Sequence, residues 1–129
     1  MKECRAHLEL RPVGGRGWES IVGGEVGRNS MPVENRGDID LCLFVEPHCE
    51  DYWMKPGEAL TIRSEAEGLD VWFDTCISKG CVTVWLYEDG DPHKLVLDYA
   101  VVDASGTRLD PGHQRPDGQR WSAAGPVID

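Results

Sequence analysis

Apolar and polar residues alternate along most of the chain with a period of two, the pattern of a strand with one buried face. Gly, Pro, Asn and Asp separate the alternating runs and favour turns. The runs predict strands at residues 4–10, 18–22, 31–34, 39–46, 59–63, 69–77, 81–88 and 95–103. We therefore expect one all-β domain, a sandwich or jelly-roll of about seven or eight mostly antiparallel strands.

Residues 39–46 predict a central strand. Ile39, Leu41, Leu43 and Val45 would face one way, while Cys42 and Phe44 make the opposite side partly apolar too. Strands that are covered on both faces show this near-continuous apolar character.

Residues 69–88 predict a hairpin that turns through residues 78–80. We expect Cys76 opposite Cys81 and Trp72 opposite Trp85, because a one-residue slip would carry apolar side chains onto the acidic face. One face would then be a clean core, and the other would carry Asp70, Trp72, Asp74, Cys76, Cys81, Trp85 and Tyr87. A second packing surface is favoured for that face over an exposed binding platform.

The sequence has five cysteines, an odd number, so they cannot all form disulfides within one chain. The expected opposition of Cys76 and Cys81 would allow a cross-strand disulfide, half of a zinc site or two neighbouring thiols. Their Cys-x4-Cys spacing differs from a zinc knuckle, so two unreactive thiols are favoured.

Residues 45–62 contain a group of polar residues that could form a site. Pro47 predicts a strand end at Glu46-Pro47. An exposed acidic loop would follow, then a type II turn with Pro56 and Gly57 at its centre and a new strand. Glu46, His48 and Glu50 alternate and could bind a divalent transition metal if another histidine joined them.

The charge of the chain narrows the classes of partner. Its 23 acidic and 13 basic residues give a formal charge of −10, which disfavours nucleic acid and anionic membranes. No apolar run reaches the about 18 residues that span a bilayer. The N-terminus lacks the apolar stretch of a signal peptide, so we expect a cytoplasmic protein with reduced thiols.

Residues 33–65 resemble a pattern in small uncharacterised bacterial proteins of actinobacterial type. The shared motifs are Val-Glu-Asn, Val-Glu-Pro, Glu-x-Tyr and a Pro-Gly-Glu turn. The resemblance implies a small β-sandwich similar to cupredoxin-like domains, with no known activity. After the Val-Glu-Pro motif, this chain has His48-Cys49 where such proteins tend to have Trp-Gly. A copper site of this fold would need a cysteine close to a histidine on a late loop, and no cysteine follows Cys81, so copper is disfavoured. A cupin metal site is disfavoured because the His-x-His motif is absent.

These patterns predict a sandwich domain at residues 1–103 and an irregular tail at 104–129, anchored at most by Trp121 or by Val127 and Ile128. The favoured function is a non-catalytic interaction or accessory module without a cofactor, which binds a protein partner or small molecule. Its candidate binding residues are Tyr52, Trp53, Trp72, Trp85 and Tyr87. The alternatives are a cupin-like metal-dependent enzyme that uses Glu46, His48 and Glu50, and a structural subunit that forms homo-oligomers.

Overall fold

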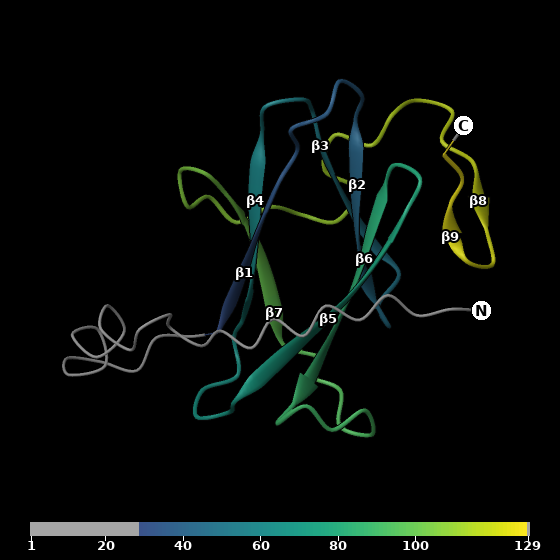
Figure 1. Ribbon diagram of the computed structural model, residues 1–129. Coiled ribbons are helices and arrows are strands. Elements are labelled where there is room, and N and C mark those ends of the chain that lie inside the picture. Colours follow the sequence, from purple (N-terminus) through teal and green to yellow (C-terminus); the bar gives the residue numbers. More distant parts are fainter. Residues whose placement is uncertain (1–28, 129) are drawn as a thin grey trace.

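The computed structural model describes residues 29–128, in which all regular structure is β-strand (Figure 1). The described strands are β1 (Ser30–Glu34), β2 (Leu41–Glu46), β3 (Glu50–Met54), β4 (Ala59–Ser64), β5 (Val71–Ser78), β6 (Cys81–Glu88), β7 (Tyr99–Asp103), β8 (Trp121–Ser122) and β9 (Gly125–Pro126). The all-β prediction is confirmed. The strands expected at residues 4–10 and 18–22 lie outside the described residues. Residues 29–128 also contain no helix long and apolar enough to cross a membrane.

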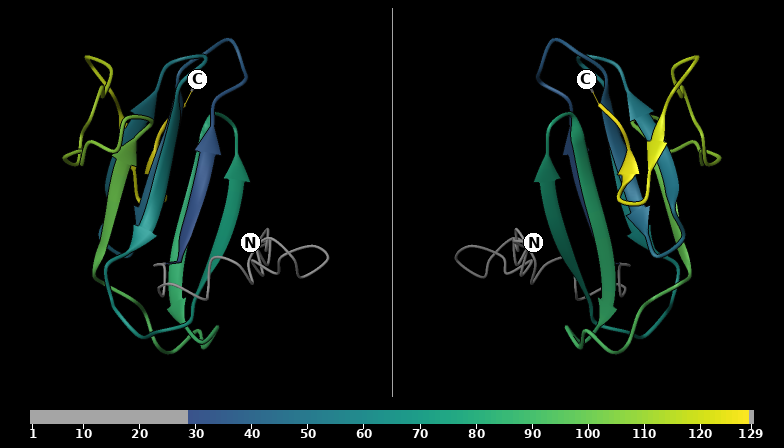
Figure 2. Two further views of the ribbon diagram at one scale, coloured as in Figure 1. Left: turned by 90° about the vertical axis from the view of Figure 1, so that its left-hand side faces the viewer. Right: turned by 90° about the vertical axis from the view of Figure 1, so that its right-hand side faces the viewer.

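Two sheets pack face to face as a sandwich, and Figure 2 shows them as two layers. The smaller sheet has the order β1-β4-β7 and is antiparallel throughout. The larger sheet has the order β3-β2-β6-β5, and β2 and β6 are its one parallel pair. Apolar side chains from both inner faces meet between the layers, including Leu43, Val45, Met54, Leu60, Ile62, Phe73, Val84, Leu86 and Val101.

The central position expected for residues 39–46 is confirmed for β2, which lies between β3 and β6 and is buried at Cys42–Val45. Leu43 and Val45 face the main core, while Cys42 and Phe44 belong to a second apolar cluster on the other side of the sheet. The prediction was wrong for Ile39, which precedes the strand and is 55% exposed.

The expected acidic loop after Pro47 is instead a buried strand. The turn is short, with Cys49 in the left-handed region (φ 55°), and β3 begins at Glu50 and pairs with β2. Residues 51–54 are buried, so the prediction of an exposed loop was wrong. Alternate residues of β3 enter the two different cores, which explains why it lacks the simple apolar-polar alternation of a one-sided strand.

The β5–β6 hairpin has the predicted faces but a different register. Its turn is the two-residue Lys79-Gly80, and Cys76 lies opposite Thr83 rather than Cys81. The tighter turn extends the ladder by further cross-strand pairs. Because the register differs by two residues, every side chain keeps its predicted face.

Residues 104–128 contain only the short strands β8 and β9 and are otherwise irregular. Figure 2 shows this segment, in yellow, lying over the outer face of β2 and β3. It contributes Ile128 to the second apolar cluster, whose buried members are Cys42, Phe44, Trp53 and Cys81. We call this cluster the outer core.

Gly80 offers a test of how closely the C-terminal segment packs. Its φ is 65°, and a Cβ there would lie 2.5 Å from Ile128 Cγ2, whereas Gly68 has φ 77° and open space around it. Gly68→Ala and Gly80→Ala should each lower the free energy of unfolding by about 1–2 kcal/mol, because alanine disfavours the left-handed backbone conformation. The clash should cost G80A about 1–3 kcal/mol more. Urea unfolding of the two variants measures the difference.

The double variant G80A/I128A provides the control. Removing the Ile128 side chain should make the Gly80 substitution cost about as much as the Gly68 substitution, so the pair would be coupled in a double-mutant cycle. Additive effects would contradict close packing of Ile128 on the hairpin turn.

Candidate functional site

Three of the five predicted aromatic residues gather on the outer face of the β5–β6 hairpin. Trp72 lies opposite Tyr87, which corrects the expected Trp72–Trp85 pair, and Trp85 lies opposite Asp74. On its other side Trp85 neighbours Glu46 of β2. Directly opposed residues share a face, so Trp85 stands between two carboxylate side chains.

The rings of this face are held in place by their neighbours. Trp85 and Tyr87 are stacked, with centroids 6.4 Å apart and planes 7° from parallel. Trp72 Nε1 donates a hydrogen bond of 3.2 Å to Asp70 Oδ2, and a Cβ on Gly90 would lie 2.8 Å from its ring. Trp72, Trp85 and Tyr87 are each partly exposed, so the face is neither an open platform nor a fully buried packing surface.

The other two predicted aromatic residues lie in the interior, on opposite sides of β3. Tyr52 joins the main core and Trp53 the outer core, and each is only 3% exposed. The structure therefore does not bring them to the face of Trp72, Trp85 and Tyr87. Sequence reasoning missed their burial because they stand beside acidic residues.

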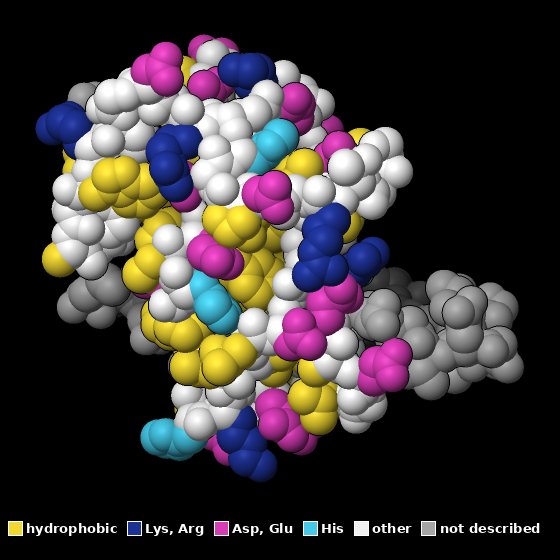
Figure 3. All heavy atoms as spheres, turned by 180° about the vertical axis from the view of Figure 1, so that it is seen from behind, with side chains coloured by type: hydrophobic (Ala, Val, Ile, Leu, Met, Phe, Trp, Pro, Cys, Tyr) yellow, Lys and Arg dark blue, Asp and Glu magenta, His cyan; other side chains and the backbone are white. Residues whose placement is uncertain are grey.

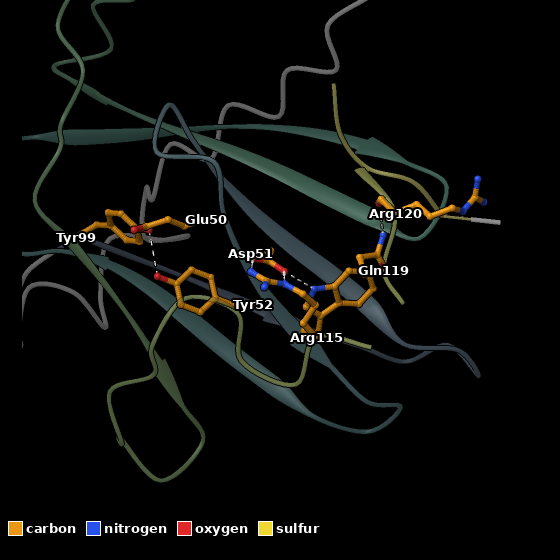
Figure 4. A network of polar contacts seen from close by, with 8 residues as sticks. Glu50, Asp51, Tyr52, Tyr99, Arg115, Gln119 and Arg120 are labelled. Carbon is orange, nitrogen blue, oxygen red and sulfur yellow. Dashed lines mark hydrogen bonds and ion pairs between the residues drawn. The ribbon is translucent and has the colours of Figure 1, made fainter. Parts of the chain in front are cut away.

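Asp51 is the fully buried carboxylate of this region, with 1% exposure, and a residue 64 positions later neutralises it. Arg115 makes two hydrogen bonds to it, Nε to Oδ2 at 2.9 Å and Nη2 to Oδ1 at 2.7 Å, and Trp53 Nε1 donates another at 2.7 Å (Figure 4). Burial opposes ionisation of Asp51, but hydrogen bonds from Arg115 and Trp53 and the charge of Arg115 outweigh it. The pKa of Asp51 is therefore lowered from its usual value.

Further contacts fix the C-terminal segment over the outer core. Arg115 lies 5.3 Å from the ring of Trp121, and Trp121 is 6.2 Å from Phe44. Gln114 Nε2 donates to the backbone oxygen of Trp53 at 2.9 Å. In addition to the expected anchors Trp121, Val127 and Ile128, this segment is held by the ion pair of buried Asp51 with partly exposed Arg115 and by backbone contacts that the sequence did not indicate.

A second polar cluster joins the two sheets where β3 and β7 are the edge strands. Tyr99 Oη donates to Glu50, and the hydroxyl groups of Tyr99 and Tyr52 are 3.1 Å apart (Figure 4). Burial, followed by hydrogen bonds to Glu50 and Tyr52, raises the pKa of Tyr99, and burial raises that of Tyr52. Both hydroxyl groups therefore stay protonated as hydrogen-bond donors well into the alkaline range.

The residues of the metal hypothesis are engaged in different contacts. His48 packs against the ring of Tyr99 at 5.3 Å, Glu50 accepts the hydrogen bond of Tyr99, and Glu46 accepts a 3.4 Å contact from Cys49 Sγ. His48 Nδ1 is buried without a hydrogen-bond partner among the described residues. No three His, Cys, Asp or Glu side chains gather as a metal-binding group within residues 29–128. The metal site stays a prediction.

An open hollow of about 290 Å³ lies where Ile39, Asp40 and Trp53 meet the C-terminal segment. Its lining includes the charged residues Asp117 and Arg120 and the apolar residues Val127 and Ile128. Pockets of this size can take a small ligand, so the hollow is a location for the small-molecule alternative.

The Asp51–Arg115 pair can be tested by Arg115→Gln, which leaves a buried carboxylate without its cation. The free energy of unfolding near neutral pH should fall by about 1–3 kcal/mol. Arg36→Gln, which breaks the exposed 3.0 Å pair between Arg36 and Glu34, is the matched control and should change it by at most about 1 kcal/mol. Equal effects of R115Q and R36Q on urea unfolding would contradict a stabilising role of the Asp51–Arg115 pair.

The same variant predicts a pH dependence. Because the pKa of Asp51 is lower in the folded chain, its stabilisation is complete above the unfolded value of about 4 and is lost as pH falls through the folded value. The unfolding free energies of the natural chain and of R115Q should therefore converge in acid. A difference that stayed constant across an acid titration would show that Arg115 acts through packing alone.

Comparisons with protein-family models, with curated proteins and with solved structures gave no match. The resemblance of residues 33–65 to actinobacterial-type proteins consequently stays a prediction.

Proposed function

We propose that the chain is a non-catalytic binding module that takes a lysine- or arginine-rich segment of a partner protein on the outer face of β5 and β6. The observation that carries the proposal is the position of Trp85, between Asp74 on one neighbouring strand and Glu46 on the other. An ammonium or guanidinium group over the indole would be attracted by the ring and neutralised from both sides.

The rest of the face supports a cationic occupant of extended shape. Tyr87 stacks on Trp85, and Trp72 lies opposite Tyr87, so an aromatic surface continues along the hairpin. Aromatic side chains on strands lose little entropy on binding because the sheet already holds them. Their partial exposure provides contact area for the aliphatic parts of lysine and arginine.

The overall charge favours the same partner. The sequence has a formal charge of −10, and Figure 3 shows acidic side chains, with Lys and Arg between them, on the face seen from behind. A negative protein attracts basic partners over distances up to the screening length, about 10 Å at 0.1 M salt, and this raises association rates. Binding should therefore weaken as salt increases.

Calorimetric titration with a lysine- and arginine-rich peptide tests the proposal. Trp85→Ala should weaken binding by about 2- to 30-fold, from loss of about 0.5–2 kcal/mol of cation–π attraction. The variant E46Q/D74N should weaken it as well and should also reduce its dependence on salt. Acetylation of the peptide lysines should abolish the lysine-dependent part of the affinity.

Trp121→Ala is the control, because Trp121 is 44% exposed but belongs to the C-terminal segment. It should leave peptide affinity unchanged while the thermal unfolding curve confirms the fold. Equal affinity of W85A and the natural chain would overturn the proposal. Analytical ultracentrifugation could instead reveal a homodimer that the W85A substitution dissociates. That result would support the alternative of a structural subunit that forms homo-oligomers through this face.

A further inference from the structure

The outer core contains two cysteine thiols that lie side by side. Cys42 of β2 and Cys81 of β6 are paired residues of neighbouring parallel strands, and their exposures are 0% and 5%. Neighbouring strands are about 4.8 Å apart, and a disulfide needs Cα atoms about 4.4–6.8 Å apart. The backbone therefore already has the spacing that a Cys42–Cys81 bridge requires, while both thiols are free in this structure.

The two thiols differ in chemical character. They are paired across neighbouring strands, and Cys81 Sγ also lies 3.9 Å from Thr83 Oγ1. The interaction of the two thiols and burial raise the pKa of Cys42, while the interaction with Cys42 lowers the pKa of Cys81. Since the thiolate is the nucleophile, Cys81 is the thiol that would react first, with Cys42 in position to follow.

The C-terminal segment controls access to this pair. Ile128 packs on the outer core and against the hairpin turn at Gly80, directly before Cys81. Val127 is held by a 2.9 Å backbone hydrogen bond to Arg120 and by Gln119 Nε2, also at 2.9 Å. Outward movement of residues 127–128 would expose the thiols without separating β2 from β6.

We infer that Cys42 and Cys81 form a redox modification site, at which a peroxide converts the two thiols into a disulfide between β2 and β6. The Cys81 thiolate attacks one peroxide oxygen, the O–O bond breaks, and a sulfenic acid and one water form after protonation. The Cys42 thiol then attacks the Cys81 sulfur, loses its proton and displaces the hydroxyl group as a second water. The two sulfurs are oxidised by two electrons in total, and the peroxide is reduced by two.

The other described cysteines lack this arrangement. Cys49 is exposed and contacts the Glu46 carboxylate, and hydrogen bonding to that group raises the pKa of Cys49. Cys76 lies opposite Thr83, so its cross-strand neighbour is a hydroxyl group rather than a thiol. Neither has a sulfur at the paired position of the next strand, and both would be expected to take up oxygen rather than to bridge.

The test treats the reduced full-length chain with hydrogen peroxide under native conditions, blocks the remaining thiols and maps peptides by mass spectrometry. The expected product is a Cys42–Cys81 cross-linked peptide that lacks two hydrogen atoms. C42S and C81S should each abolish this cross-link, whereas C49S and C76S should leave it unchanged. Ile128→Ala should accelerate formation of the cross-link several-fold, because a smaller side chain then covers the outer core.

Three results would overturn the inference. The first is that both thiols stay reduced while Cys49 or Cys76 is oxidised. The second is a dominant bridge that joins either thiol to another cysteine. The third is a cross-link that forms only after unfolding in urea, which would show that the folded arrangement does not favour it.

Discussion

The buried carboxylate of Asp51 is the constraint on which the arrangement of this protein depends. An ionised carboxylate with 1% exposure needs a cation and hydrogen bonds, and Arg115 and Trp53 supply them. The cation comes from the irregular segment after β7, so that segment must lie across β3. This ion pair therefore acts together with the contacts of Gln114, Trp121 and Ile128 to hold the last part of the described chain on the sandwich.

This packing divides the outer face of the larger sheet. Over β2 and β3 the face is covered, and Cys42, Phe44 and Trp53 are buried there beside Ile128. Over β5 and the far end of β6 the side chains stay partly exposed. The outward residues of β6 thus pass from buried Cys81 at one end to partly exposed Trp85 and Tyr87 at the other, and the two ends have different chemistry.

The two ends also depend on different physical effects. At Cys81 the parallel partner strand brings a second thiol, and both thiols are buried in the outer core. At Trp85 the neighbouring strands bring the carboxylates of Glu46 and Asp74, which are partly exposed. A common β-sheet geometry, in which direct neighbours share a face, creates both groupings.

The sequence by itself determined the all-β class, the strands from β1 to β7 except β3, and which face of the β5–β6 hairpin enters the main core. Local alternation carries that information, because it depends only on residues close in the chain. Tertiary structure alone decided the burial of β3, since the cation that neutralises Asp51 lies 64 residues away. It also decided that Cys81 neighbours Cys42, because β2 and β6 are parallel strands that no turn connects. On the hairpin side, the two-residue turn places Ser78 rather than Cys76 opposite Cys81.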